Sequence, residues 1–273
     1  MSGLGTRVSA ALSGPVGTRL ATPLGSLLVS VRRREPCLVR YDGTDWIHRY
    51  PDGTVVRSRL GGGSASILDR AARDTFLYGY VPGPGDVVLD IGAGTGEEVR
   101  VFAGLVGDTG RVVCVEAHPR TYRCLTKTVV HNRLANVSTV HCAVTDRPGP
   151  VFISDDEVAY VSNSLTDAGH GVGVPGRPLT EILARAGVDH VDLLKLNIEG
   201  AEYAVLAAAL EVLPTIANLV VSCHDFKADR LGAGGPRTFA AVTELLGGAG
   251  FAVRTRPADR RRPWLRDYVY ASR

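Results

Sequence analysis

The sequence is poor in the features that mark membrane-embedded, secreted and metal-binding proteins. No stretch of its 273 residues approaches the ~20 consecutive apolar residues of a membrane-spanning helix. Residues 1–25 hold no apolar core free of glycine, proline and arginine, as a secretory signal requires. The five cysteines are widely spaced without a CxxC pair, which favours buried thiols over disulfides or a zinc site. We therefore expect a soluble, cytoplasmic protein without a bound metal.

A large excess of charge of either sign is also missing. The 31 basic and 28 acidic residues leave a net charge of +3, which does not indicate a nucleic-acid-binding protein. With 45% apolar and 22% charged residues, the composition excludes the disordered and fibrous classes. The sequence therefore predicts a globular protein with a sizeable core.

The first 75 residues predict an extension that precedes the main domain. Residues 1–30 are rich in Gly, Ser, Thr and Ala and predict a loosely ordered lead-in. Three short runs of β-branched and aromatic residues follow, separated by Asp-Gly and Pro-Asp-Gly turns that are typical of hairpins. Ser64 can cap a helix, because apolar residues after it recur at three- and four-residue spacing. We expect this extension to cover the cofactor or acceptor side of the main domain.

From residue 76 onward, apolar strands alternate with amphipathic helices, which implies parallel strands joined by helical crossovers. The last two strands are joined without room for a helix and should be antiparallel. A glycine-rich stretch at 167–177 predicts a loop. The predicted strands cover residues 87–91, 111–117, 136–144, 191–198, 218–224, 251–256 and 267–272. We therefore predict an α/β domain over residues 76–273, with a mostly parallel, seven-stranded sheet and an antiparallel C-terminal hairpin.

The strongest motif is a glycine-rich turn between the first strand of this domain and the helix after it. Gly92, Gly94 and Gly96 stand at the first, third and fifth positions, whereas the dinucleotide fingerprint GxGxxG places its last glycine one residue later. Glu97 and Glu98 follow in the predicted first helical turn, where they disfavour a pyrophosphate and tolerate a cationic ligand. The motif therefore favours S-adenosylmethionine (SAM) over NAD.

Residues at the ends of three strands complete the predicted cofactor site. Asp90 can accept a hydrogen bond from the ammonium group of SAM, and Glu116 can bind both ribose hydroxyls, as a carboxylate does for NAD. Cys142 and Ala143 could sandwich an adenine ring or belong to an ordinary packed core. The residues that we expect to bind SAM are Asp90, Gly92, Ala93, Gly94, Gly96, Glu97, Glu116, Ala117, Cys142, Ala143 and Asn197.

Three segments together carry a resemblance to a known family. They are the turn from Asp90 to Gly96 with Glu116, LLKLNIEGAE from Leu193 to Glu202, and VSCHDF from Val221 to Phe226. Over residues 76–226 the chain resembles the FkbM family of SAM-dependent methyltransferases. The resemblance implies the Rossmann-like class I fold, SAM as cofactor, and O-methylation of a sugar, glycolipid or natural product. Asn197 stands where the family more often has aspartate, so a metal or proton-transfer role is not implied there.

The predicted acceptor site consists of Asn197, Glu199, His224 and Asp225, at the ends of two strands. Ligands bind at the carboxyl ends of strands in open α/β sheets, so we expect the four side chains to converge. Methyl transfer to a hydroxyl requires removal of its proton, and an imidazole that titrates near neutrality suits that task. His224 is therefore the predicted base, with Asp225 or no base as alternatives. Glu199 could instead cap the following helix.

Other residues have weaker or structural interpretations. Ser162–Ser164 and His170 flank the glycine-rich stretch and are expected at the acceptor pocket. Lys195, inside an apolar strand, is expected to pair with a carboxylate. His118 and His141 lack a partner at metal-ligand spacing and are interpreted as structural. Two alternative functions stay open: N-methylation of a small molecule, which can dispense with a base, and a SAM-binding module without turnover.

Overall fold

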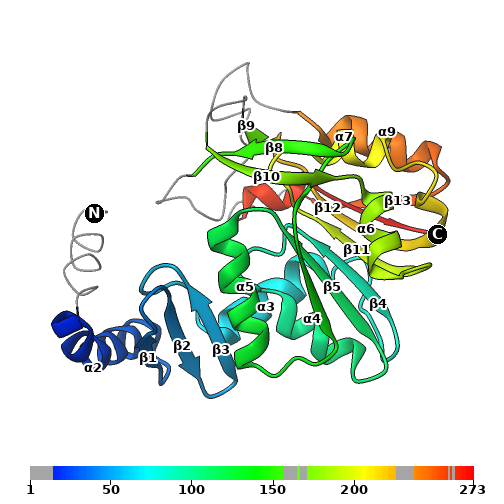
Figure 1. The fold of residues 1–273 in the computed structure, drawn as a ribbon. Helices are drawn as coiled ribbons and strands as arrows, with labels where there is room; N and C mark the ends of the chain where they lie inside the picture. The colour runs from blue at the N-terminus through cyan, green and yellow to red at the C-terminus, as the bar shows by residue number, and fades with distance from the viewer. Residues whose placement is uncertain (1–14, 156–164, 167–170, 226–236, 258, 260–261) are drawn as a thin grey trace.

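The computed structural model describes residues 15–155, 165–166, 171–225, 237–257, 259 and 262–273. Within these residues the chain forms three sheets, of three, four and seven strands. A small N-terminal unit carries the three-stranded sheet, and it lies beside the larger α/β domain in Figure 1. No helix of the described residues is long and apolar enough to cross a membrane.

The α/β domain is built on the seven-stranded sheet. Neighbours from β12 to β6 pair in parallel, whereas β14 runs antiparallel to both β12 and β13. In spatial order the strands are β13 (Ala252–Thr255), β14 (Tyr268–Ser272), β12 (Ile216–Ser222), β11 (Val191–Leu196), β4 (Val87–Ile91), β5 (Arg111–Glu116) and β6 (Val137–His141). The predicted fold is confirmed. The chain order reverses between β4 and β11, and such a reversal is where open α/β sheets bind ligands.

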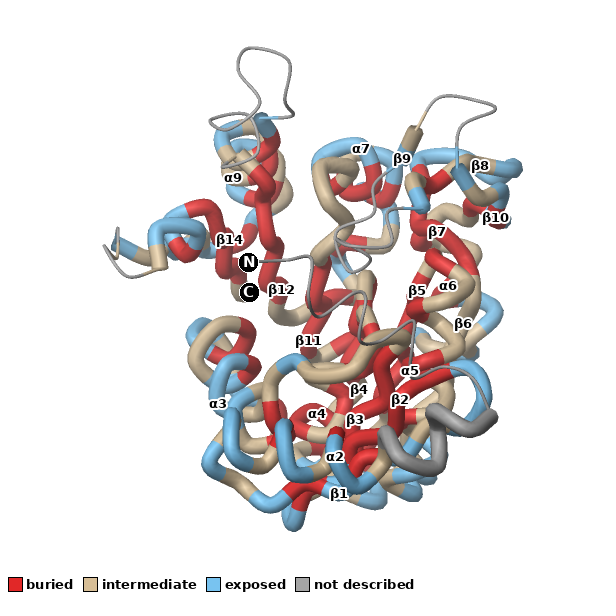
Figure 2. The backbone as a smooth tube through the Cα atoms, turned by 90° about the vertical axis from the view of Figure 1, so that its left-hand side faces the viewer, coloured by how far each residue is buried: buried red, intermediate tan, exposed pale blue. Residues whose placement is uncertain are grey.

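Helices cover both faces of this sheet because its central strands are apolar on both sides. On β4, Val88 packs in one core with α3, α4 and α5, and its neighbour Leu89 packs in the other with α6, α7 and α9. Figure 2 shows the buried central strands among partly exposed helices. The helices are α3 (Ala65–Phe76), α4 (Val99–Val106), α5 (Pro119–His131), α6 (Leu179–Ala186), α7 (Glu202–Ala207) and α9 (Phe239–Gly248), with short 3-10 turns η1 (Leu213–Thr215) and η2 (Pro263–Asp267).

A four-stranded sheet adjoins the main one and differs from the predictions in two respects. Its strands are β7 (Ala143–Val144), β10 (Val172–Arg177), β8 (Gly149–Ile153) and β9 (Leu165–Thr166), in that spatial order. The predicted strand 136–144 breaks at Cys142, because β7 leaves the main sheet to pair with β10. The second half of the predicted loop 167–177 is β10. Gly176 allows close backbone approach, since a Cβ there would lie 2.8 Å from the carbonyl oxygen of Gly149.

The N-terminal unit consists of α2 (Pro15–Arg33) packed on an antiparallel sheet of β1 (Leu38–Tyr41), β2 (Trp46–Tyr50) and β3 (Gly53–Arg57). The predicted hairpins are confirmed. The predicted loose lead-in is wrong from Pro15 onward, and residues 1–14 lie outside the described part of the chain. The hydroxyl of Ser26 accepts a hydrogen bond from the backbone N–H of Val39 at 2.9 Å. Contacts with β1 thus stabilise a helix whose glycine, serine and proline give it low intrinsic propensity.

A buried carboxylate joins this unit to α5. Asp45 is fully buried and accepts two hydrogen bonds of 2.8 Å from Arg123 and one of 2.7 Å from Lys127. Helix α3 crosses the predicted domain boundary, and Phe76 packs in the core of the α/β domain. The division into an extension over 1–75 and a domain over 76–273 stays a prediction.

Candidate active site

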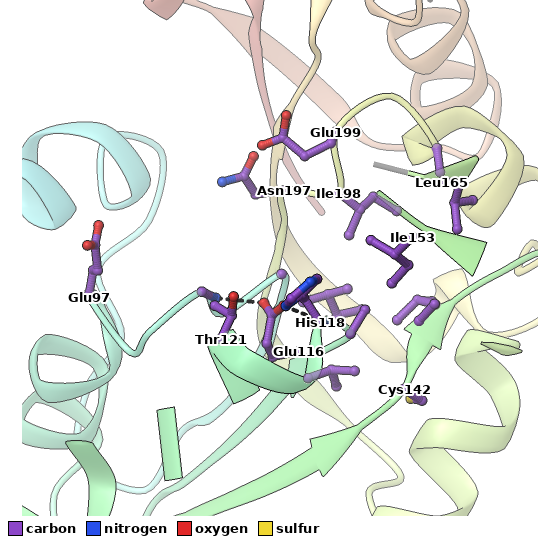
Figure 3. A pocket seen from close by; sticks show the side chains of 18 of the residues that line it. Glu97, Glu116, His118, Thr121, Cys142, Ile153, Leu165, Asn197, Ile198 and Glu199 are labelled. Carbon is purple, nitrogen blue, oxygen red and sulfur yellow. Dashed lines mark hydrogen bonds between the residues drawn. The ribbon is translucent and has the colours of Figure 1, made fainter. Parts of the chain in front are cut away.

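A cavity of about 290 Å³ opens at the carboxyl ends of β4, β5 and β11, beside the reversal of strand order. This volume is at the lower end of the range for small-molecule sites. Figure 3 shows Asn197 and Glu199 on one side of the cavity, Glu116 at its base, and Ile153 and Leu165 on the other side. The cavity is therefore the candidate site for a small-molecule ligand.

Nine of the predicted site residues line this cavity: Gly92, Gly94, Glu97, Glu116, Ala117, Cys142, Ala143, Asn197 and Glu199. The other five, Asp90, Ala93, Gly96, His224 and Asp225, are not among its lining residues. The N-terminal unit contributes no lining residue within the described chain, and reaches the cavity through an ion pair between Arg57 and Glu97 at 3.6 Å. Ser162–Ser164 and His170 lie outside the described residues.

The glycine-rich turn needs glycine for two different reasons. Gly92 has φ +74°, and a Cβ there would lie 1.9 Å from the carbonyl oxygen of Asn197, so the turn packs tightly against β11. Gly94 has φ +58°, and a Cβ there would meet nothing within 4 Å. Gly92 is therefore required by packing, whereas Gly94 leaves open space that faces the cavity.

Glu116 presents its carboxylate at the end of β5. Its two oxygens accept hydrogen bonds of 2.9 Å from the backbone N–H groups of Gly94 and His118, drawn as dashed lines in Figure 3. Burial raises the pKa of Glu116 to about 7, although these backbone donors act to lower it. His118, which sequence analysis interpreted as structural, also lines the cavity, and its Nε2 lies 3.1 Å from Asp155 Oδ1.

Asp90 has a partner from the chain itself. Its Oδ1 lies 2.8 Å from Nζ of Lys195, and both side chains are almost completely buried. Lys195 also donates a 2.6 Å hydrogen bond to the carbonyl oxygen of Gly92. Burial opposes the charged form of Lys195, but Asp90 and Glu98 outweigh it and raise the lysine pKa. The expected pairing of Lys195 with a carboxylate is confirmed. Lys195 also stabilises the glycine-rich turn through its hydrogen bond to Gly92.

The titratable lining of the cavity is mainly acidic. Its carboxylates belong to Glu97, Glu98, Glu116 and Glu199, and its described lining residues include no lysine or arginine. Glu97 and Glu98 precede α4 instead of forming its first turn. Burial raises the pKa of Glu98 to about 8, with Lys195 acting against it. Although Glu98 is therefore largely uncharged near neutral pH, this lining offers a pyrophosphate no lysine or arginine and suits a cationic ligand better.

A cluster of two carboxylates and an imidazole adjoins the cavity. His224 Nδ1 lies 2.7 Å from Glu202 Oε1, and its Nε2 lies 3.4 Å from Glu199 Oε1. Burial lowers the pKa of His224, but its hydrogen bonds to Glu199 and Glu202 outweigh burial and raise it to about 9. The imidazole is therefore a cation at neutral pH. Glu199 has φ +63°, a conformation that costs a non-glycine residue ~1–2 kcal/mol.

Of the other predicted acceptor residues, Asn197 lines the cavity and Asp225 supports a helix. Asp225 Oδ1 accepts hydrogen bonds from the backbone N–H groups of Thr238 at 2.8 Å and Phe239 at 3.1 Å, at the start of α9. The N-cap residue of α7 is Ala201, so Glu199 is not the cap of that helix.

Sequence reasoning missed the apolar wall of the cavity. Ile153 ends β8 and Leu165 begins β9, and both reach the cavity from the small sheet. Ile198, between two predicted site residues, also lines it. Nothing local in the sequence of β8 indicated which cavity this strand would line.

A match to a family model decides the affiliation of the chain. Residues 90–270, well over half of the sequence, match the model described as the methyltransferase FkbM domain. The chain belongs to the FkbM methyltransferase family. SAM is its cofactor, and the resemblance noted in the sequence is confirmed.

Two similar proteins also carry the FkbM name. The 31-O-demethyl-FK506 methyltransferase FkbM of Streptomyces tacrolimicus is 27% identical over 241 residues, which cover 75% of this chain and 88% of the relative. The crystal structure of methyltransferase FkbM from Methylobacillus flagellatus KT has a TM-score of 0.50 at 15% identity, and the match covers 77% of this chain. The match spans 50% of that chain. The shared fold is the Rossmann-like methyltransferase fold.

The residues present in this FkbM-family protein fit SAM. The open side of Gly94 leaves room for a ligand, and Glu116 lines the cavity with a carboxylate whose orientation two backbone donors hold. The acidic lining suits a ligand that carries a sulfonium and an ammonium group. Glu116 is the residue that we expect to bind the ribose, with Cys142 and Ala143 beside the adenine.

We expect Glu116→Gln to raise the SAM dissociation constant at least tenfold, since a hydrogen bond to a charged group contributes ~1.5–3 kcal/mol. Wild-type affinity should also weaken as the pH falls below about 7, because protonation of Glu116 removes its charge. Calorimetry on both sides of that pH measures both effects, with the exposed Glu211→Gln as control. Unchanged affinity in Glu116→Gln would show that another residue binds the ribose.

Proposed function

We propose that this chain is an O-methyltransferase that acts on a hydroxyl of a small-molecule acceptor: a natural product, a sugar or a glycolipid. The observation that carries this proposal is the position of the Glu199 carboxylate. Glu199 lines the cavity, and His224, which is not among the lining residues, contacts the Glu199 carboxylate. The printed name of the Streptomyces tacrolimicus relative describes methylation of a 31-O-demethyl compound, which supports an oxygen acceptor. The proposal includes a cytoplasmic role in natural-product biosynthesis.

The cluster favours Glu199 over His224 as the base. With a pKa of about 9, His224 is an imidazolium at neutral pH and has no lone pair to accept a proton. It donates to Glu199 and Glu202 and keeps the Glu199 carboxylate oriented. Glu199 lines the cavity, and a carboxylate in that position can accept the hydroxyl proton. We therefore assign the base to Glu199 and a positioning role to His224.

The chemistry follows from this assignment. Bound SAM supplies an electrophilic methyl group on a sulfonium. Glu199 would take the proton of the acceptor hydroxyl as the oxygen forms its bond to the methyl carbon and the carbon–sulfur bond breaks, so that the sulfur leaves as a neutral thioether. The protonated Glu199 would then return the proton to solvent. Ile153, Leu165 and Ile198 form an apolar wall that can pack against the acceptor and exclude water.

A product assay tests the proposed function. The purified protein is incubated with SAM carrying a labelled methyl group and with a panel of hydroxylated macrolides, glycosides and glycolipids, alongside the corresponding amines. We expect an acceptor-dependent methyl ether. A methylated amine as the sole product would support N-methylation, and tight SAM binding without transfer to any acceptor would support a binding module.

A further inference from the structure

The outer face of α2 carries an apolar stripe that is exposed in the described part of the chain. Leu24, Leu27, Leu28 and Val31 recur at three- and four-residue spacing, and each side chain is between 58% and 69% exposed. The opposite face packs on β1 through residues such as Val29, which is 4% exposed. Figure 2 shows α2 at the surface with exposed residues along it. The helix therefore presents four large apolar side chains to solvent, although its inner face is already packed on β1.

Charge along this part of the chain has one sign. Residues 1–34 contain five arginines and neither aspartate nor glutamate, and the first acidic residue is Glu35. Three of the arginines, Arg32, Arg33 and Arg34, follow directly after the stripe, and Arg32 and Arg34 are exposed. The chain as a whole carries only +3, so this segment is markedly more basic than the remainder.

We propose that α2 binds the surface of an anionic lipid membrane. An amphipathic helix with leucines on one side and arginines nearby lies in the interface, with its apolar face among the acyl chains and its cations at the headgroup phosphates. This segment has both elements: the stripe Leu24, Leu27, Leu28 and Val31 on the outer face of α2, and the exposed cations Arg32, in its last turn, and Arg34, directly after it. This inference is independent of the acceptor and of the methylated atom.

The same observations disfavour a second copy of the chain as the occupant. The stripe spans residues 24–31, about 10 Å of helix, whereas a coiled-coil seam needs three to four heptads. An α2–α2 pair would also offer Arg32 and Arg34 no carboxylate, because α2 itself contains no acidic residue. Anionic lipid supplies the complementary charge.

Vesicle co-sedimentation of the full chain tests the inference. We expect binding to phosphatidylcholine vesicles that contain phosphatidylglycerol, weaker binding to phosphatidylcholine alone, and release by salt. Leu27→Glu/Leu28→Glu should reduce the bound fraction about tenfold on anionic vesicles. The matched control is Val130→Glu/Leu210→Glu, which alters apolar residues elsewhere in the chain that are 71% and 53% exposed and should bind like the wild type.

The arginines provide a second, independent variant. Arg32→Ser/Arg34→Ser should weaken binding to the anionic vesicles and remove most of its salt dependence, with thermal unfolding unchanged because both side chains are exposed. Absence of binding to the anionic vesicles, or wild-type binding by Leu27→Glu/Leu28→Glu, would overturn the proposal. A concentration-dependent dimer that this leucine variant dissociates, without vesicle binding, would assign the face to a second copy.

Discussion

Glu199→Gln is expected to lower the turnover number by about 10²- to 10⁴-fold, the usual contribution of a positioned general base. The amide keeps the size and most hydrogen bonds of the carboxylate but cannot take a proton, so the dissociation constant of SAM should stay within about threefold. Single-turnover kinetics with a labelled methyl group, beside calorimetry with SAM, separates the two effects. The surface variant Glu211→Gln controls for loss of one negative charge.

The pH profile distinguishes the base from its positioning partner. His224 has a pKa of about 9 because two carboxylates outweigh its burial, so the imidazolium is present below that pH and lost above it. If the imidazolium holds Glu199, wild-type turnover should fall as the pH rises through about 9. His224→Gln should start lower and lack this decline. A turnover number that instead rises through about pH 9 would identify His224 as the base and refute the assignment to Glu199.

Gly94→Asn is expected to weaken SAM binding by about 5- to 150-fold, since overpacking a filled site costs ~1–3 kcal/mol. Asparagine tolerates the left-handed conformation that Gly94 adopts at φ +58°, and its Cβ meets nothing within 4 Å. The variant should therefore fold, with the new side chain in the open space where we expect SAM. Calorimetry measures the affinity and a thermal melt checks the fold.

A glycine of nearly the same φ outside the cavity is the control for this variant. Gly187 ends α6 at φ +59° and ψ +48°, and a Cβ there also meets nothing within 4 Å. Gly187→Asn should match Gly94→Asn in backbone strain and bind SAM like the wild type. If both variants bind normally, the cofactor does not approach the glycine-rich turn.

Local patterns in the sequence determined the order of elements in the α/β domain. Continuous apolar runs such as β4 and β11, separated by helices of 3.6-residue periodicity, specify parallel strands with crossovers because burial on both faces requires them. Glycine adopts positive φ without steric cost, so the tight turn at Gly92 and Gly94 was recognisable before any contact was known. The strand ends then indicated Glu116 and Asn197, and both line the cavity.

Only the tertiary structure decided the features that depend on distance. Helix α2 packs on β1, which offsets its low intrinsic propensity, and Gly176 in β10 allows the backbone of β8 to approach closely. His224 and Glu202 are 22 positions apart in the sequence, and folding brings Nδ1 to 2.7 Å from the carboxylate. The residue type alone gives the ordinary pKa of an imidazole. The pKa of a buried imidazole also depends on the charges around it, and the sequence does not show which charged residues folding will bring there.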